Sequence, residues 1–338
     1  MKLNRPKTLV GIILVIGFLF PLILSPFYLI LSTEIFLMAI FALSFNLLFG
    51  YTGLLSFGQG AYFATGAYVC AYLLKKSLPF VGAIIISIIL AFLLAAIFGY
   101  FSVRLNKIYF AMLTLALGMM VYTLIFQGRE VTGGSDGITG IKITQIGIPG
   151  LNFDWQNFTH YYYLSLLVFL MSTYLIWRIT HSPFGELLQA SRENSQRLIF
   201  TGVNIRQLHW LAFTIAGVFA GLAGALWSPF QRVANPEIAH WTFSAMPVLM
   251  TILGGYRRFA GPIVGASLFL LLEHFVKANQ RYFWQWLASL PILPANLATR
   301  QLDLWNMGLG LLLIILILGF KEGILASFVK VSKIFSKN

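Results

Sequence analysis

The chain has 338 residues, of which 59% are hydrophobic and only 10% are charged. Soluble domains are about 45–50% apolar and about 25% charged, so this composition excludes an ordinary soluble enzyme and indicates an integral membrane protein. The formal net charge is +13. In a soluble protein that charge would suggest a nucleic-acid partner, but membrane topology accounts for it better here.

Apolar runs predict about ten transmembrane helices in a single all-α domain, residues 1–338. The clearest runs have the length that a helix needs to cross a hydrocarbon core of about 30 Å. Helices also satisfy every backbone polar group in lipid. The predicted spans are 9–31, 33–49, 53–74, 80–103, 108–127, 161–179, 208–228, 241–256, 259–276 and 304–320.

The basic residues orient these spans. If both termini are cytoplasmic, most lysines and arginines fall inside, as the positive-inside rule requires; Lys75 and Lys76 are exceptions. The first run begins like a signal peptide but lacks a clear small-x-small cleavage site, so a retained span is favoured over a cleaved signal. The single cysteine, Cys70, excludes an intrachain disulfide and is interpreted as a small membrane-buried side chain.

Two long loops connect the predicted spans. The outer loop, 128–160, is rich in glycine at its start, and Ile141, Ile143 and Ile146 alternate with polar neighbours. That pattern predicts turns and a small hairpin. The inner loop, 180–207, has helix-forming residues around a charged, Asn-containing middle. We therefore expect a helix–turn–helix at the cytoplasmic face.

Catalytic motifs are lacking in the sequence. There is no GxxxxGK[ST] phosphate loop, so we expect no ATPase site in this chain. GQG at 58–60 has Phe63 where a dinucleotide fingerprint has its third glycine. No HxxxH or HExxH spacing suggests a metal site, and no bound cofactor is expected. Glu273 lies within a predicted span, either as a proton site or as a local pair with Lys277.

Small residues recur at helical spacing in two predicted spans. Ala212, Ala216, Ala220 and Gly224 are four residues apart, and Gly217 and Gly221 form a GxxxG beside them; Gly261 and Gly265 repeat the pattern. Such spacing lets helix backbones approach closely in lipid. These glycines are therefore assigned to helix packing.

The stretch GYTGLLSFGQGAYFATGAY, residues 50–68, is unusually polar for a membrane segment. As a helix it would place Gly53, Ser56 and Gly60 on one side with Gln59 beside them, and Asn46 could partner Gln59 or Ser56. Polar and small residues gather in spans where helices break or line a wet cavity. Asn46, Ser56 and Gln59 are thus candidates for a substrate pathway, with helix packing as the alternative.

Four segments together resemble the branched-chain amino-acid permease family, the membrane subunits of bacterial ATP-binding-cassette importers. They are the 50–68 stretch, RLNKIYFAMLTLALGMM followed by VTGGSDGITGI, SRENSQRLIFTGVNIRQLHWLAFTIAGVFAGLAGAL, and VLMTILGGYRRFAGPIVGASL. They occur in the family's order and cover roughly residues 35 to 275. The resemblance implies the importer permease fold and a place in the bacterial inner membrane.

It also implies partners. Such a permease pairs with a second homologous permease, receives an amino acid from a periplasmic binding protein, and is driven by two cytoplasmic ATPase subunits that use ATP with Mg²⁺. The inner loop resembles the family's coupling motif, with Glu193 and Gly202 at matching positions and Leu198 where an alanine is usual. The residues assigned to ATPase coupling are Arg192, Glu193, Asn194, Arg197 and Gly202; a merely solvated charged face is the alternative.

Three other functions stay open at this stage. A related importer permease could carry urea, short amides or other amino acids, or form a homodimeric rather than a heterodimeric pore. An ion-coupled secondary transporter would need paired intramembrane carboxylates, for which only Glu273 qualifies. A membrane-embedded enzyme would need clustered His, Asp or Ser residues.

Overall fold

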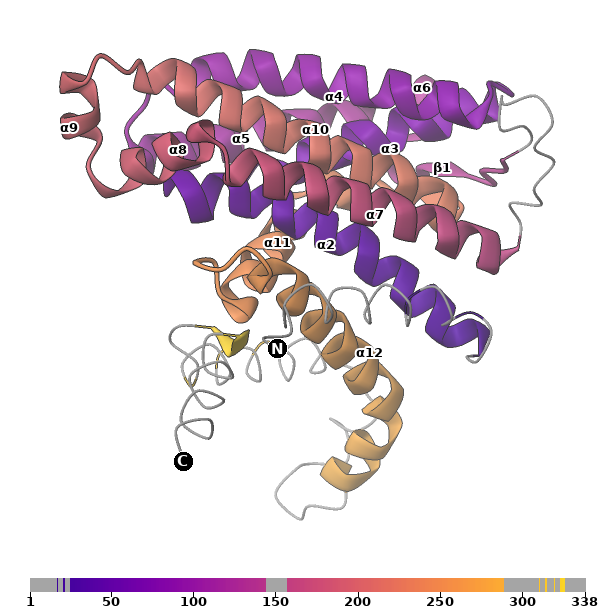
Figure 1. Cartoon of the computed structure of the whole chain (residues 1–338). Helices are drawn as coiled ribbons and strands as arrows, with labels where there is room; N and C mark the ends of the chain where they lie inside the picture. The colour runs from indigo at the N-terminus through magenta and orange to yellow at the C-terminus, as the bar shows by residue number, and fades with distance from the viewer. Residues whose placement is uncertain are drawn as a thin grey trace, which may run out of the picture. The chain divides into compact units, whose positions relative to one another are not determined.

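Figure 1 shows a computed structural model of the chain, which describes residues 17, 21, 25–143, 157–288, 310, 314, 319 and 323–325. It contains two compact units that meet in sequence between Pro247 and Val248. Most of the predicted spans 9–31 and 304–320 lies outside the described residues.

The first long helix, α2, runs without interruption from Pro26 to Thr52. The predicted break between 31 and 33 is therefore wrong, and residues 26–31 belong to this helix. Pro26 occupies the first helical turn, where its missing N–H costs nothing. Ser32 and Thr33 donate from their hydroxyls to the carbonyls of Tyr28 and Leu29 one turn back.

Further helices follow the predicted spans closely in the first unit, except that α3 begins at Gln59, six residues after the predicted start. They are α3 (Gln59–Lys75), α4 (Phe80–Ser102), α5 (Lys107–Gln127), α7 (Phe158–Thr180) and α10 (Ile205–Gln231). The inner loop forms two short helices, α8 (Pro183–Glu193) and α9 (Ser195–Phe200), as the sequence predicts. In Figure 1, α8 and α9 lie at one end of this helix bundle and β1 lies at the other.

The outer loop differs from its prediction. It contains α6 (Arg129–Thr132), a 3-10 turn η1 (Gly134–Asp136) and β1 (Ile138–Thr139). β1 pairs antiparallel with β2 (Val233–Ala234), which follows α10, so the expected hairpin within 128–160 does not form in the described part of that loop. The pairing joins residues almost a hundred positions apart, and local alternation of apolar residues does not reveal it. Ile146 lies outside the described residues.

Helix α3 forms the centre of the first unit, packed against α10 and α4. The glycines of α10 bring the backbones together. A Cβ on Gly217 would overlap Ala95 of α4, one on Gly221 would overlap Ala91, and one on Gly224 would overlap the carbonyl of Phe63. Cys70 is fully buried in α3, as expected.

The second unit contains the end of α11 (Trp241–Gly254) and α12 (Gly261–Ala288). A Cβ on Gly265 would overlap the carbonyl of Met250, and one on Gly261 would overlap that of Gly255. Within α12, the Lys277 ammonium donates to the Glu273 carboxylate at 2.6 Å, so the local pair expected from the sequence forms.

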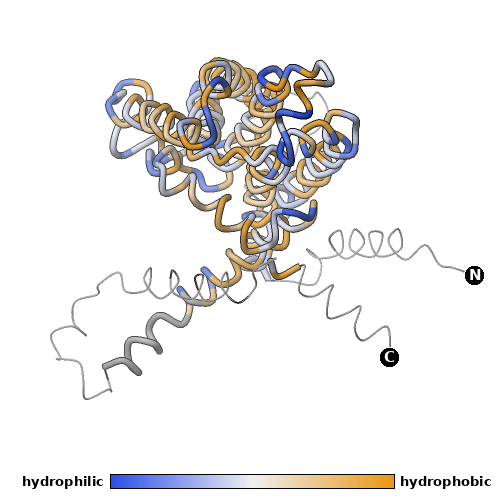
Figure 2. The backbone as a smooth tube through the Cα atoms, turned by 90° about the vertical axis from the view of Figure 1, so that its left-hand side faces the viewer, coloured by the Kyte–Doolittle hydropathy of each residue, from blue (hydrophilic) through white to orange (hydrophobic). Residues whose placement is uncertain are grey.

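Five helices among the described residues are long and apolar enough to cross a membrane: α2, α4, α5, α7 and α10. In Figure 2 the helices are coloured largely hydrophobic, while hydrophilic colour gathers in the connecting segments. The chain is an all-α, multi-pass membrane protein. The count of ten spans and the side of the termini stay predictions.

Candidate functional site

A six-residue break separates α2 from α3 in the stretch that the sequence singled out. α2 ends at Thr52, and Gly53 adopts a left-handed conformation with φ of 73°, which favours glycine. Residues 53–58 are not helical, so the predicted helical stripe of Gly53, Ser56 and Gly60 does not form. The break has its own turn chemistry: the hydroxyl of Ser56 accepts from the amide of Gly58.

The broken segment lies against the middle of α5. The amide of Phe57 donates to the Thr114 hydroxyl at 3.3 Å. Gly58 approaches so closely that a Cβ there would lie 2.5 Å from the Thr114 carbonyl, and one on Gly118 would lie 3.2 Å from the Gly58 Cα. α5 is long and apolar enough to cross a membrane, and α3 begins against its middle.

The beginnings of two helices meet at this point. The amide of Gly60, in the first turn of α3, donates to the hydroxyl of Ser244 in the first turn of α11 at 2.8 Å. Behind this contact, the rings of Phe41, Phe63 and Phe243 pack at centroid distances of 4.8, 5.0 and 5.6 Å. Helix beginnings carry partial positive charge, so the junction brings two such ends together inside the membrane-spanning bundle.

Three buried atoms of amide side chains near the break have no hydrogen-bond partner among the described residues. Two are the carbonyl oxygen and the amide nitrogen of Gln59, which is fully buried, and the third is the side-chain oxygen of Asn46. The expected pairing of Asn46 with Gln59 therefore does not form. Native structures rarely leave such groups unpaired, and each one calls for an explanation.

The inner loop presents most of its predicted coupling residues to solvent. Glu193, Asn194, Arg197 and Gly202 are exposed. Asn194 caps α9, its side-chain oxygen accepting from the amide of Arg197 at 3.0 Å. Gly202 has φ of 83° and open space where a Cβ would stand.

The exposure of Phe200 and the burial of Leu198 were not predicted from the sequence. Phe200, at the end of α9, is 91% exposed and is the most exposed large apolar side chain among the described residues. Leu198, by contrast, is buried. An apolar residue in a charged loop is the signal that would have identified Phe200.

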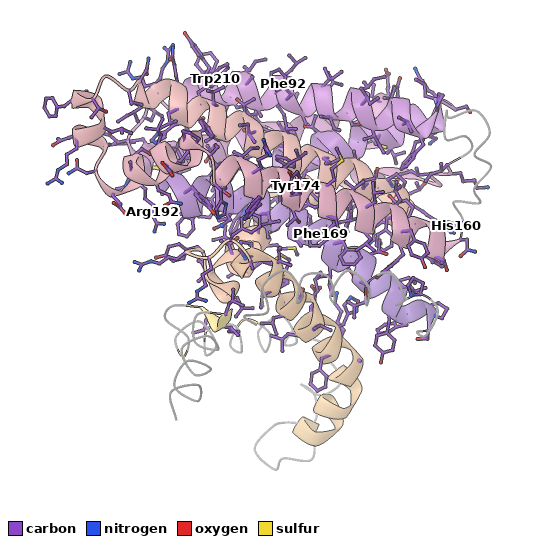
Figure 3. All side chains as sticks on the ribbon, viewed as in Figure 1. Phe92, His160, Phe169, Tyr174, Arg192 and Trp210 are labelled. Atoms are coloured by element: carbon purple, nitrogen blue, oxygen red, sulfur yellow. The ribbon has the colours of Figure 1, made fainter. Side chains whose placement is uncertain are left out.

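Arg192 differs from the other predicted coupling residues. It is half-buried, and its guanidinium donates to the carbonyl of Gly50 in the last turn of α2. Figure 3 labels Arg192 at the end of the bundle that holds α8. Its neighbour Ser191 is buried, and the Ser191 hydroxyl oxygen lies 3.0 Å from Nε2 of His209 in α10.

Comparison with known proteins decides the family. The sequence model of the family described as "Branched-chain amino acid transport system / permease component" matches residues 27–326. The chain belongs to this family of permeases. The matched range contains both the broken helix and the inner loop.

Relatives of this permease include the "High-affinity branched-chain amino acid transport system permease protein LivM" of Escherichia coli strain K12. It is 27% identical over 311 residues, covering 86% of this chain and 73% of the relative. A probable LivM permease of Methanocaldococcus jannaschii is 27% identical, covering 69% and 76% of the two chains. The LivH permease of Escherichia coli K12 is 24% identical, covering 70% and 80%. No solved structure matches the chain.

Proposed function

We propose that this permease is a membrane subunit of an ATP-binding-cassette importer that carries leucine, isoleucine and valine across the bacterial inner membrane. The family match over residues 27–326 carries the proposal. The chain would work with a second homologous permease, two cytoplasmic ATPase subunits and a periplasmic binding protein. The ATPase subunits would use ATP with Mg²⁺, and this chain would bind no cofactor.

The inner loop supports coupling to an ATPase. Asn194 caps α9 directly after α8, and Leu198 of α9 is buried, so we expect α8 and α9 to move together. Phe200 offers a large apolar side chain beside the exposed charges of Glu193 and Arg197. An aromatic anchor with a charged rim is typical of protein-docking surfaces. Closure of the ATPases would move the loop as a rigid body and rock the spans around a central pathway.

The broken helix supports a role in that pathway. Irregular backbone within membrane depth is tolerated where it is buried in protein or lines a cavity, and transporters place binding sites at such breaks. Gln59 and Asn46 keep buried hydrogen-bonding atoms without protein partners, which a passing polar substrate or water can use. Ser56 already accepts from Gly58, so we assign it chiefly to shaping the turn.

The substrate proposal follows from the relatives. Their names specify branched-chain amino acids. The alternative substrates are urea, short amides and other amino acids. In such importers the binding protein makes much of the selection, so the permease pathway need not discriminate sharply.

The test is substrate competition in liposomes that contain the complete importer. We expect labelled leucine to be taken up, excess unlabelled isoleucine or valine to suppress that uptake, and excess urea to leave it unchanged. Suppression by urea, with none by isoleucine or valine, would assign the permease to the related urea and amide group.

A further inference from the structure

We propose that Arg192 is a positioning residue that connects the inner loop to the broken helix, so that movement of α8 displaces the end of α2 and the segment leading to Gln59. The inference rests on the proposed function and assigns Arg192 a role within it. Arg192 would act inside the permease, unlike the exposed loop residues that would meet the ATPase.

Arg192 takes the place of a backbone hydrogen bond that is missing at the end of α2. In a continuing helix the amide of Leu54 would donate to the carbonyl of Gly50. Here the chain breaks at Gly53, and the Leu54 amide donates to the hydroxyl of Thr52 at 3.3 Å instead. The guanidinium of Arg192 donates to the Gly50 carbonyl that this leaves available.

The electrostatics favour the same contact. The last carbonyls of a helix carry partial negative charge, which attracts cations. A Cβ on Gly53 would lie 3.2 Å from the Arg192 Cγ and 3.8 Å from the Lys107 ammonium nitrogen. Two cationic side chains, one from α8 and one from the start of α5, therefore lie close to the C-terminal end of α2. A charged hydrogen bond to the carbonyl of a buried residue such as Gly50 is among the stronger non-covalent links that a protein offers.

A second contact fixes α8 at the same end of the bundle. Ser191, adjacent to Arg192, lies 3.0 Å from the His209 ring nitrogen in α10. The final turn of α8 is thus attached to two membrane-crossing helices by consecutive residues. α9, which follows directly, ends at the exposed Phe200. A force applied to α9 therefore reaches α2 and α10 through this turn.

The contact with α2 lies next to the candidate pathway. Asn46 is one helical turn before Gly50 on the same face of α2, since residues four apart lie above one another. Beyond Gly50, the left-handed Gly53 begins the segment that ends at Gln59. Displacing the Gly50 end of α2 would shift Asn46 and Gln59 together.

The experiment uses the complete importer in liposomes with wild-type chain, Arg192→Ala, Arg192→Lys and Arg104→Ala. ATPase association, ATP hydrolysis and leucine uptake are measured in each. We expect Arg192→Ala to retain the ATPase subunits and to hydrolyse ATP within about twofold of wild type, while uptake falls about tenfold or more, in the range of typical coupling between sites. Arg192→Lys should recover a substantial part of the uptake, because an ammonium can still donate to the Gly50 carbonyl.

Arg104→Ala is the matched control. Arg104 is an exposed arginine after α4 whose guanidinium lies over the Tyr100 ring at 4.0 Å. Its removal should leave uptake and hydrolysis unchanged.

Three results would contradict the inference in different ways. Unchanged uptake by Arg192→Ala, with active wild type, would overturn it and leave the proposed function standing. A parallel loss of assembly, hydrolysis and uptake, with lysine no better than alanine, would show that Arg192 only maintains the loop's fold. A wild-type complex without ATP-driven uptake would overturn the proposed function and this inference with it.

Discussion

Gln59 is the residue at which the energetic cost of the broken helix is clearest. Burying a carboxamide without hydrogen bonds costs about 1–3 kcal/mol relative to its solvated form. Gln59 incurs this cost at the first position of α3, where an apolar residue would suit the buried position better. The proposed role in the pathway would account for a polar residue at this position.

Replacing Gln59 by leucine should therefore move stability and transport in opposite directions. We expect Gln59→Leu to raise the free energy of unfolding by about 1–3 kcal/mol, because the desolvation penalty disappears. Leucine uptake should fall, because the pathway loses its polar group. Uptake kinetics and resistance to denaturing detergent measure the two effects.

Ser165→Ala in α7 is the matched control, since the Ser165 hydroxyl is also fully buried without a partner. It should raise stability without changing uptake. Normal uptake by Gln59→Leu would assign Gln59 to packing alone.

Among the elements, α3 depends on close approach to α10. A Cβ on Gly66 would overlap the carbonyl of Gly221, and the reciprocal contact at Gly224 involves Phe63. Backbone atoms cannot rotate out of the way as side chains do. The two helices would have to separate to admit even one methyl group.

Gly66→Ala should accordingly lower the free energy of unfolding by about 1–3 kcal/mol, the usual cost of overpacking a filled core. Gly82→Ala in α4 is its control, because open space surrounds the Cβ position there. The same substitution should be neutral or slightly stabilising at Gly82, since alanine is the better helix former. Reversible unfolding in mixed detergent micelles compares the pair, and equal stabilities would refute the packing argument.

How far the sequence predicts these elements depends on the range of the forces involved. Apolar runs and the glycine spacing of α10 are local patterns, and they predicted membrane-spanning helices and their close-packed face. The predicted spans placed the break at 50–52 rather than at 53–58, because a glycine and a serine can serve either packing or a turn. The β1–β2 pair and the Arg192–Gly50 bond join distant segments, which no local pattern in one sequence specifies.

At the scale of the whole molecule, the two ends of the first unit differ in structure. The end with α8 and α9 combines the exposed Phe200 with the charged inner loop, while the other end carries β1 and the outer glycine-rich segment (Figure 1). The broken helix lies between them, against the middle of α5. This arrangement suits an importer in which substrate enters at one end and the ATPase subunits drive motion at the other.

Two glycines allow the ends to be tested separately. Gly202, in the inner loop, and Gly140, after β1, both have positive φ, of 83° and 71°, and both have open space at the Cβ position. Arginine at either position therefore has a similar backbone cost and adds the same charge. Only Gly202→Arg should interfere with an ATPase docked on the inner loop.

The most direct measurement of the central claim is leucine uptake into liposomes that contain the complete importer, with ATP supplied at the ATPase side. We expect this uptake to require ATP and to persist when a protonophore or a sodium ionophore collapses the ion gradients. Gly202→Arg should abolish both uptake and ATPase association. Gly140→Arg should leave both intact. Uptake that proceeds without ATP and stops when an ion gradient collapses would contradict the account and identify an ion-coupled secondary transporter.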